Sequence, residues 1–501
     1  MTMGGKRKPL LSRVPADFVR AVLKGHGALG LAFAAAIYLV CLTGSLAVFA
    51  REFQRWELAN ASHVEALAPD AVQRALAEAV RRAGAGVEHG YIRLPADDLP
   101  QATITIEAES GTATWLIDAD GQLAGRGETP WTEFLTRLHI NLHLPQAWGV
   151  FLVGLTGVAL LSSLISGLLA HPRIFRDAFH MRLGGSRRLQ EADLHNRIGI
   201  WALPFHVIVS LTGALLGLTT LIVGVLGMAL FQGDSGKIYE LFLPPEPKED
   251  SRPAPVIDLQ PLFRQVEQTL APGGRVDMVL LEHPTERGGA AWFMLEQGTR
   301  WLANADSLAF TRDGTLYYEK RAETNNLGES ILGSIGKLHF GWFGGGIVKI
   351  AYGLLGLGLT YLAAGGVTIW LARRRDKRNP APGIERLWAA TLWSQPVALC
   401  VAAIAALLFP AMGTALPLSL WGVLTLAMLA GARFCPARTA SRAGRAATGG
   451  LLVVVATAHV LTRGGGADPM AWLLDGVLLI AGVGFLLSLR SRSQNVPAMA
   501  G

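Results

Sequence analysis

The chain has 501 residues and a mass of 53.4 kDa, with 51% hydrophobic and only 17% charged side chains and a mean hydropathy of +0.35. Soluble domains carry about 25% charged residues, so this composition excludes a disordered chain and indicates a polytopic membrane protein with some soluble mass. Three cysteines without a Cys-x-x-Cys motif exclude a disulfide-stapled module and any readable zinc or iron–sulfur site.

Apolar stretches long enough to cross a bilayer recur along the chain. A span needs roughly 20 residues to cross about 30 Å of hydrocarbon. Eight stretches reach or approach that length: 27–50, 147–170, 200–231, 343–370, 388–410, 416–432, 447–462 and 470–489. The first lacks the cleavage pattern of a signal peptide, so we expect it to remain as a membrane span.

Acidic and basic loops alternate between these spans. Residues 51–146 hold 14 acidic and 8 basic side chains, and residues 231–338 hold 16 and 11. Most of the remaining positive charge lies in short segments: Lys6–Lys8, Arg173–Arg188, Arg373–Arg378, Arg433–Arg445 and Arg490–Arg492. The positive-inside rule places these segments and both termini in the cytoplasm and the two acidic loops outside. The net charge of +7 is therefore a topology signal, and we expect no nucleic-acid partner.

Each acidic loop has the pattern of a small α+β domain. In the first we expect a helix over 71–83, strands at 102–107 and 114–117 and a hairpin turn at Asp120-Gly121. In the second we expect a helix over 262–270, a strand at 291–295 and a turn at Asp313-Gly314. The two loops look like copies of one domain.

The first four spans repeat as well. His26 and His195 each begin a pattern His-x-x-x-Gly followed by Thr-Gly, with the threonine 17 residues after the histidine. A Leu-His pair, at His139 and His339, precedes the second and fourth spans. The expected core is therefore a four-helix unit of two span–domain–span copies, with sites at the interface between the halves.

This reading divides the chain into six parts. They are 1–50 (cytoplasmic N-terminus and first span), 51–146 (outer domain), 147–231 (two spans with a short basic loop), 232–338 (outer domain), 339–372 (fourth span) and 387–490 (four additional spans).

Histidines concentrate in the repeated spans. Seven of the 12 lie in or beside them: His26, His139, His143, His171, His195, His206 and His339. Ionisable groups in a membrane are costly and usually functional, and neutral imidazole is the usual axial ligand of haem iron. A single histidine has a simpler reading, as an interfacial side chain bonded to a carbonyl or water, but the paired spacing of the set favours cofactor ligation.

Antiparallel packing suggests how these histidines pair. We expect His26 and His195 to hold one haem near the cytoplasmic face. We expect a second haem near the outer face, held by His339 together with either His139 or His143.

Other residues have more open assignments. His206 lies at mid-depth and is a candidate ligand for either haem or for a third one, and His171 is a fallback cytoplasmic ligand or a helix-end residue. Lys349, Arg137 and Arg197 are candidate partners for haem propionates, and the arginines are equally readable as interfacial anchors. Small residues recur on these spans, either to admit a flat macrocycle or to let helices pack closely: Gly30, Gly44, Gly154, Gly157, Gly167, Gly199, Gly213, Gly217 and Gly366.

Several motifs carry a family resemblance. They are Arg137–Pro145, Ser166–His171, Asp193–Asn196, Leu203–His206, Thr212-Gly213 and Leu338–Gly341. With them the sequence resembles the PepSY-associated transmembrane family, which includes siderophore reductases of the ferrioxamine-reductase type, across roughly residues 20–375. The resemblance implies periplasmic PepSY domains, haem b between the helices, and reduction of a ferric siderophore or other Fe(III) chelate outside the bacterial inner membrane. The four C-terminal spans lie beyond it.

The cytoplasmic loops are too short for a nucleotide-binding unit, which needs about 30 residues or more. We therefore expect electrons to come from membrane quinol or a cytoplasmic donor and to pass through the haems to the chelate. Two other functions stay open. One is a non-enzymatic regulator that binds a periplasmic peptidase or peptide. The other is a metal or siderophore transporter. The spans hold few acidic residues, with Asp475 the clearest, so proton-coupled transport has little support from the sequence.

Overall fold

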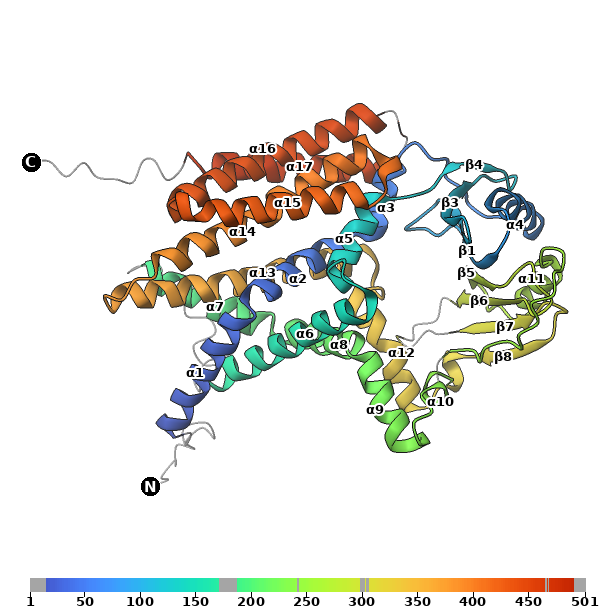
Figure 1. The fold of residues 1–501 in the computed structure, drawn as a ribbon, viewed down its shortest axis with the longest axis horizontal. Coiled ribbons are helices and arrows are strands. Elements are labelled where there is room, and N and C mark those ends of the chain that lie inside the picture. The colour runs from blue at the N-terminus through green and yellow to red at the C-terminus, as the bar shows by residue number, and fades with distance from the viewer. Residues whose placement is uncertain are drawn as a thin grey trace, which may run out of the picture.

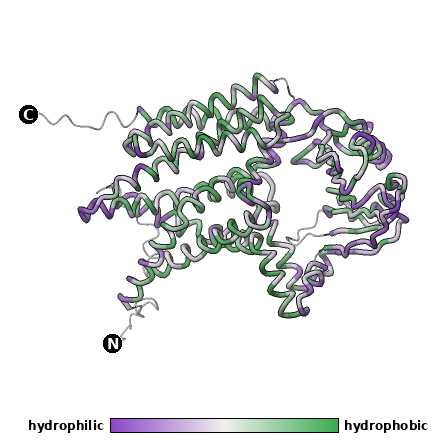
Figure 2. The backbone as a smooth tube through the Cα atoms, in the orientation of Figure 1, coloured by the Kyte–Doolittle hydropathy of each residue, from purple (hydrophilic) through white to green (hydrophobic). Residues whose placement is uncertain are grey.

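The computed structural model describes residues 15–170, 187–240, 243–297, 302, 306–464, 466 and 468–490. A bundle of helices and an eight-stranded sheet at one end of it make up the molecule (Figure 1). We call that end of the bundle the sheet end and the opposite one the far end. The first helix, α1 (Ala16–Ala32), begins and the last, α17 (Pro469–Leu487), ends at the far end. The helices are mainly hydrophobic between the two ends, whereas hydrophilic residues are frequent over the sheet (Figure 2).

Six described helices are long and apolar enough to cross a membrane. They are α6 (Gln146–Leu169), α13 (Gly345–Asp376), α14 (Pro382–Leu408), α15 (Ala415–Gly431), α16 (Ala437–Arg463) and α17. Two bent helix pairs bring the candidate spans in the described chain to as many as eight. The expectation of a helical membrane protein is confirmed, with six to eight candidate spans.

The first and third expected spans are not straight. α1 meets α2 (Ala34–Ala47) at 67° around Phe33, and α7 (Arg187–Trp201) meets α8 (Leu203–Gly217) at 71° around Ala202. Both break residues leave the helical region, with φ near −100° and ψ near +10°. Each break lies seven residues after a histidine, His26 or His195. The two halves of the repeat therefore bend at equivalent positions.

Shorter helices surround the spans: α3 (Ala50–Glu57), α5 (Pro130–Asn141), α9 (Thr219–Phe231), α10 (Gly236–Tyr239) and α12 (Leu327–Phe340). Within the described residues, single turns of 3-10 helix cover Ala322–Thr324, Pro410–Met412 and Ala432–Phe434. α5 ends at Leu142 and α12 at Gly341, both in the left-handed conformation that stops a helix and reverses the chain. These reversals lead directly into α6 and α13.

The two helices and three strands expected in the acidic loops lie close to their predicted positions, and the structure adds five strands that were not expected. The strands are β1 (Val87–Arg93), β2 (Ala102–Ala108), β3 (Gly111–Ile117), β4 (Leu123–Arg126), β5 (Arg275–Glu282), β6 (Ala290–Glu296), β7 (Ser307–Thr311) and β8 (Leu316–Lys320). The helices are α4 (Pro69–Ala83) and α11 (Gln260–Glu267). Gly121 and Gly314 occupy the expected turns with φ of +80° and +86°. The two copies thus have matching elements.

The expectation of two separate domains needs a correction, because both copies share one sheet. β1 and β5 pair antiparallel, which gives the strand order β4-β3-β2-β1-β5-β6-β7-β8. Each copy alone would leave the outer side of its first strand with unpaired N–H and C=O groups, and pairing the two edges satisfies them. α4 and α11 contribute to one continuous core with the strands, which includes Leu76, Ile92, Phe263 and Phe293.

The C-terminal helices α14 to α17 pack on one another and on α3 and α5 at the sheet end. Their shared core includes Trp56 of α3, Phe134 of α5 and Leu399 of α14. This unit therefore contacts the segment that leads into α6.

Candidate functional site

At the sheet end, two histidines from opposite halves of the repeat face each other. His139 lies near the end of α5 and His339 near the end of α12, and their ring centres are 6.1 Å apart with planes at 17°. A metal–imidazole bond is about 2 Å long, so two imidazoles on opposite sides of one metal ion have centres roughly 6 Å apart. The two rings therefore already have the spacing of an axial ligand pair.

Hydrogen bonds at Nδ1 leave Nε2 of both rings available. His139 Nδ1 lies 3.0 Å from the Val40 carbonyl oxygen, which can only accept, so this nitrogen carries the proton. His339 Nδ1 lies 3.1 Å from Thr212 Oγ1, and that hydroxyl already donates to the Ile208 carbonyl oxygen. The hydroxyl therefore accepts from His339. Bonds of this kind orient metal-binding histidines and fix their tautomer.

The glycine of each Thr-Gly motif lies directly against one of the two histidine rings, and we call such a contact a glycine seat. A Cβ atom on Gly44 would come within 2.6 Å of His139 Cε1, and one on Gly213 within 2.8 Å of His339 Cε1. At these positions the glycines make room for imidazoles rather than for a macrocycle directly. Gly154 is different, because it packs against the backbone of α8 and serves close helix packing.

The histidine pair lies in a cavity of about 500 Å³ whose lining is mostly apolar. Helices α2, α5, α6, α8, α12 and α13 all contribute to its wall. Within the described residues, no group of three or more His, Cys, Asp or Glu side chains is arranged to hold a metal ion. His139 and His339 are the residues of this cavity that would hold a haem iron, and the haem would supply a one-electron couple there. The residues present fit a haem.

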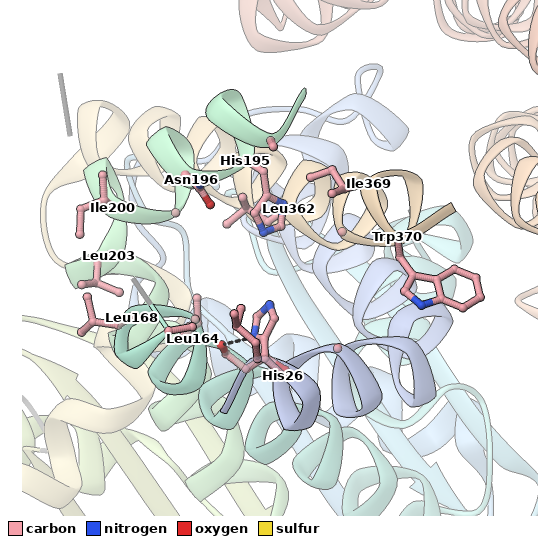
Figure 3. Close-up of a pocket in the computed structure, with 18 of the residues that line it drawn as sticks. His26, Leu164, Leu168, His195, Asn196, Ile200, Leu203, Leu362, Ile369 and Trp370 are labelled. Carbon is pink, nitrogen blue, oxygen red and sulfur yellow. Dashed lines mark hydrogen bonds between the residues drawn. The ribbon is translucent and has the colours of Figure 1, made fainter. Parts of the chain in front are cut away.

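At the far end, His26 of α1 and His195 of α7 face each other across a second space (Figure 3). They line two adjoining cavities of about 200 and 140 Å³. His26 Nδ1 lies 3.0 Å from the Ser163 carbonyl oxygen and 3.2 Å from Ser166 Oγ, which again favours a proton on Nδ1. The expected pairing of these two histidines at one end of the bundle thus agrees with their placement.

Glycines also lie beside the far-end rings. A Cβ on Gly167 would be 3.4 Å from His26 Cε1, and one on Gly366 would be 3.7 Å from His195 Cε1. These are ordinary contact distances, so the far-end seats are looser than those at the sheet end.

Apolar side chains separate the two ends. Ile37, Leu160 and Leu359 line both the sheet-end cavity and the smaller far-end cavity. These three shared side chains are uncharged and apolar, so an apolar layer lies between the two cavities.

His143, the alternative partner of His339, is engaged elsewhere. It sits in the turn after α5 with φ of +53°, and its ring stacks on Phe134. Its Nε2 donates to the Phe134 carbonyl oxygen at 2.8 Å. The structure therefore brings His139, not His143, to His339.

His206 does not join either pair. His206 is fully buried on α8 beside Leu355 of α13, away from the linings of the three cavities described above. Neither of its ring nitrogens makes a hydrogen bond within the described chain. Its role as a ligand stays a prediction. His171 lies outside the described residues.

Lys349, a candidate propionate partner, is buried and already paired. Its Nζ lies 2.8 Å from Glu52 Oε1 and 3.4 Å from Asp98 Oδ2, and Arg51 pairs with the same aspartate. Although burial opposes ionisation, Arg51 and Lys349 hold the pKa of the Asp98 carboxyl below its usual value. This network joins α3 and α13 to the loop between β1 and β2.

The two candidate arginines have different surroundings. Arg137 is exposed and pairs with Glu133 one helical turn away, at 2.9 Å, as an interfacial anchor would. Arg197 is buried on α7.

The C-terminal helices contain a buried polar cluster that was not predicted from the sequence. No role was expected for these helices. His459 and Asp475 contact Trp56 of α3. Asp475 was visible in the sequence as a carboxylate in an apolar span, but His459 lies outside the repeat and had no signal of its own.

Comparison with known proteins identifies the family of this chain. Residues 23–373 match the family described as the PepSY-associated TM region. The chain belongs to the PepSY-associated transmembrane family. The sequence resemblance to this family is thereby confirmed, whereas the match does not show a reductase subtype. An uncharacterized protein of Pseudomonas aeruginosa is 32% identical over 255 residues, which cover 49% of this chain and 64% of that relative. In this PepSY-associated protein, helices α14 to α17 lie beyond the family match.

Proposed function

We propose that this membrane protein is a haem b electron carrier that reduces an Fe(III) chelate, such as a ferric siderophore, at its sheet end. The observation that carries the proposal is the His139–His339 pair. Its rings have centres 6.1 Å apart, their Nδ1 atoms are hydrogen-bonded, and they lie in a cavity of about 500 Å³. A haem bound there supplies a one-electron Fe(III)/Fe(II) couple.

The chain's own residues hold and orient the ligand pair. The Val40 carbonyl and the Thr212 hydroxyl keep the proton on Nδ1 of the two rings, which makes each Nε2 a better metal ligand. The apolar lining of the cavity limits contact with water, so burial would tune the reduction potential of a haem held there.

The far-end pair supports a second haem held by His26 and His195. Two sites at opposite ends of a membrane bundle, separated by Ile37, Leu160 and Leu359, suit electron transfer across the bilayer. The donor at the far end would be membrane quinol or a cytoplasmic protein. His206 lies fully buried on α8 and is the remaining candidate for a third site.

Charge distribution supports the orientation. The basic run Arg373–Arg375 closes α13, and the positive-inside rule then places the far end in the cytoplasm and the sheet in the periplasm of a bacterial inner membrane. A chelate reduced at the sheet end would release Fe(II), because the hard oxygen ligands of siderophores hold Fe(III) more strongly.

An optical spectrum of the detergent-purified protein, oxidised and then reduced with dithionite, tests the proposal. We expect sharp b-type α and β bands and about two haems per chain by pyridine haemochrome. A well-folded sample that binds no haem would overturn the proposal and favour a PepSY-domain regulator or a transporter.

A further inference from the structure

A buried polar cluster ties the C-terminal helices to α3. Asp475 of α17, His459 of α16 and Trp56 of α3 are all at most 3% exposed. Asp475 Oδ1 accepts from Trp56 Nε1 at 2.9 Å, and Oδ2 lies 2.7 Å from His459 Nδ1. His459 Nε2 lies 2.8 Å from the Trp56 carbonyl oxygen, and the two rings stack at 4.4 Å. The three residues form a closed cycle of contacts.

The partners of His459 define where its protons are. The Trp56 carbonyl oxygen can only accept, so Nε2 of His459 carries a proton. Nδ1 lies 2.7 Å from a carboxylate oxygen of Asp475, so one hydrogen bond joins the two side chains. They form a buried hydrogen-bonded pair, and changing one partner leaves the other without its hydrogen bond. Such a pair holds Trp56 in one position.

Glu57, the residue after Trp56, connects α3 to the start of α5 by hydrogen bonds. The Glu57 carboxylate accepts from Trp131 N at 2.8 Å, Thr132 N at 2.9 Å and Thr132 Oγ1 at 2.6 Å. The Glu57 carboxyl group thereby satisfies N–H groups at the start of α5 that have no partner within the helix. α5 then carries His139 near its other end.

We infer that Asp475 and His459 are positioning residues for His139, acting through Trp56 and Glu57 on helix α5. The C-terminal helices thereby set the geometry of the sheet-end site from outside the part of the chain that matches the family. α12, which carries His339, packs mainly on α8 and lies outside this chain of contacts. The haem measurements in the test below rest on the proposed function, whereas the hydrogen-exchange measurement does not.

Two variants of the full-length protein test it. Asp475→Asn replaces a carboxylate oxygen by an amide nitrogen with little change in shape, and Trp56→Phe removes the N–H donor and part of the buried ring volume while keeping an aromatic ring. For both we expect a several-fold faster amide hydrogen exchange in α5 and no change in α12. In the haem-loaded protein we expect roughly tenfold weaker haem retention at the sheet end and a shifted midpoint potential there, with the far-end haem unchanged. Trp56→Phe should give the smaller effects.

Gly482→Ala is the matched control. A Cβ there would come 2.8 Å from the Gly449 carbonyl oxygen, so it strains the same pair of helices, α16 and α17. Gly449 is ten residues from His459, about 15 Å along the helix. This variant should leave α5 exchange and both haems as in the wild type.

The outcomes separate the two proposals. Unchanged α5 exchange and unchanged sheet-end potential in Asp475→Asn would overturn the inference, as would equal changes at both haems or in the control. If Asp475→Asn does not fold, Trp56→Phe decides in the same way. A wild type without haem would defeat the proposed function alone, because α5 exchange still tests the positioning.

Discussion

The two histidine pairs of this protein are built from equivalent parts of an internal repeat, yet they differ in how fully they are formed. At the sheet end, short helices place His139 and His339 with ring centres 6.1 Å apart in one cavity of about 500 Å³. At the far end, His26 and His195 sit on the arms of bent spans and line smaller cavities of about 200 and 140 Å³.

The glycine seats show the same difference. A Cβ would approach the sheet-end rings to 2.6 and 2.8 Å, but the far-end rings only to 3.4 and 3.7 Å. Rings held on several sides need little rearrangement to ligate a metal, and a preorganised site binds more tightly. The comparison therefore predicts a firmly held cofactor at the sheet end and a more adjustable one at the far end, where α1 and α7 meet their bends.

Removing a sheet-end ligand should have the largest effect. His339→Ala leaves His139 without its partner, so we expect loss of one of the two haems while the far-end haem keeps its spectrum. Haem quantitation and the reduced optical spectrum measure this. His143→Ala is the control, because that ring is bound to the Phe134 carbonyl, and it should retain both haems. Loss of haem in His143→Ala but not in His339→Ala would contradict the assigned pair.

Filling the glycine seats tests the difference between the ends directly. Gly44→Ala forces a Cβ into the space of His139, whereas Gly366→Ala meets His195 only at ordinary contact distance. We expect haem affinity at the sheet end to fall roughly tenfold or more in the first variant, and a change below about twofold at the far end in the second. Apo-protein titration with haemin measures both. Equal losses would show that the two ends are equally tight.

Much of this arrangement follows from the sequence. The charge of the loops and the length of the apolar stretches predicted the spans. The His-x-x-x-Gly repeat pointed to His26 with His195, and the Leu-His pairs pointed to His339 with either His139 or His143. Local patterns suffice there, because hydrophobic length and residue spacing are properties of short segments.

Other features of the fold and the site could not be predicted from the sequence, because they depend on contacts between distant segments. The pairing of β1 with β5 joins two domains that each look complete, and no local pattern reveals which edges meet. The choice of His139 over His143 depends on the left-handed turn after α5, and the Thr-Gly motif acquires a meaning only when its partner ring from another helix is placed. The Asp475–Trp56 contact spans 419 residues.

Within the sheet end, the two Thr-Gly seats differ in how closely the threonine hydroxyl approaches the ring. Thr212→Val removes a hydroxyl that lies 3.1 Å from His339 Nδ1 and leaves the Val209 carbonyl as its partner. Thr43→Val removes a hydroxyl that lies 3.5 Å from His139 Nδ1, which keeps the Val40 carbonyl at 3.0 Å. A weaker Nδ1–H bond makes the imidazole a poorer donor to Fe(III). We therefore expect Thr212→Val to raise the sheet-end midpoint potential on the order of tens of millivolts, and Thr43→Val to raise it less. Redox titration followed at the α band checks this, and a fall in potential in Thr212→Val would contradict it.

The smallest expected effect concerns the attachment of the sheet to the bundle. Asp98 bridges the two through Arg51 and Lys349, which hold its pKa below the ordinary value of 3.8. A carboxyl with a lowered pKa in the folded state contributes stability above its ordinary pKa and loses it as the pH falls through the folded value. Because this side chain is 40% exposed, the contribution is below about 1 kcal/mol.

Limited proteolysis between β1 and β2 should therefore accelerate only below about pH 4 in the wild type, and at neutral pH in Asp98→Asn. The exposed neighbour variant Asp97→Asn should behave like the wild type, and the far-end haem spectrum should not change in either, since the bridge acts on the sheet end alone.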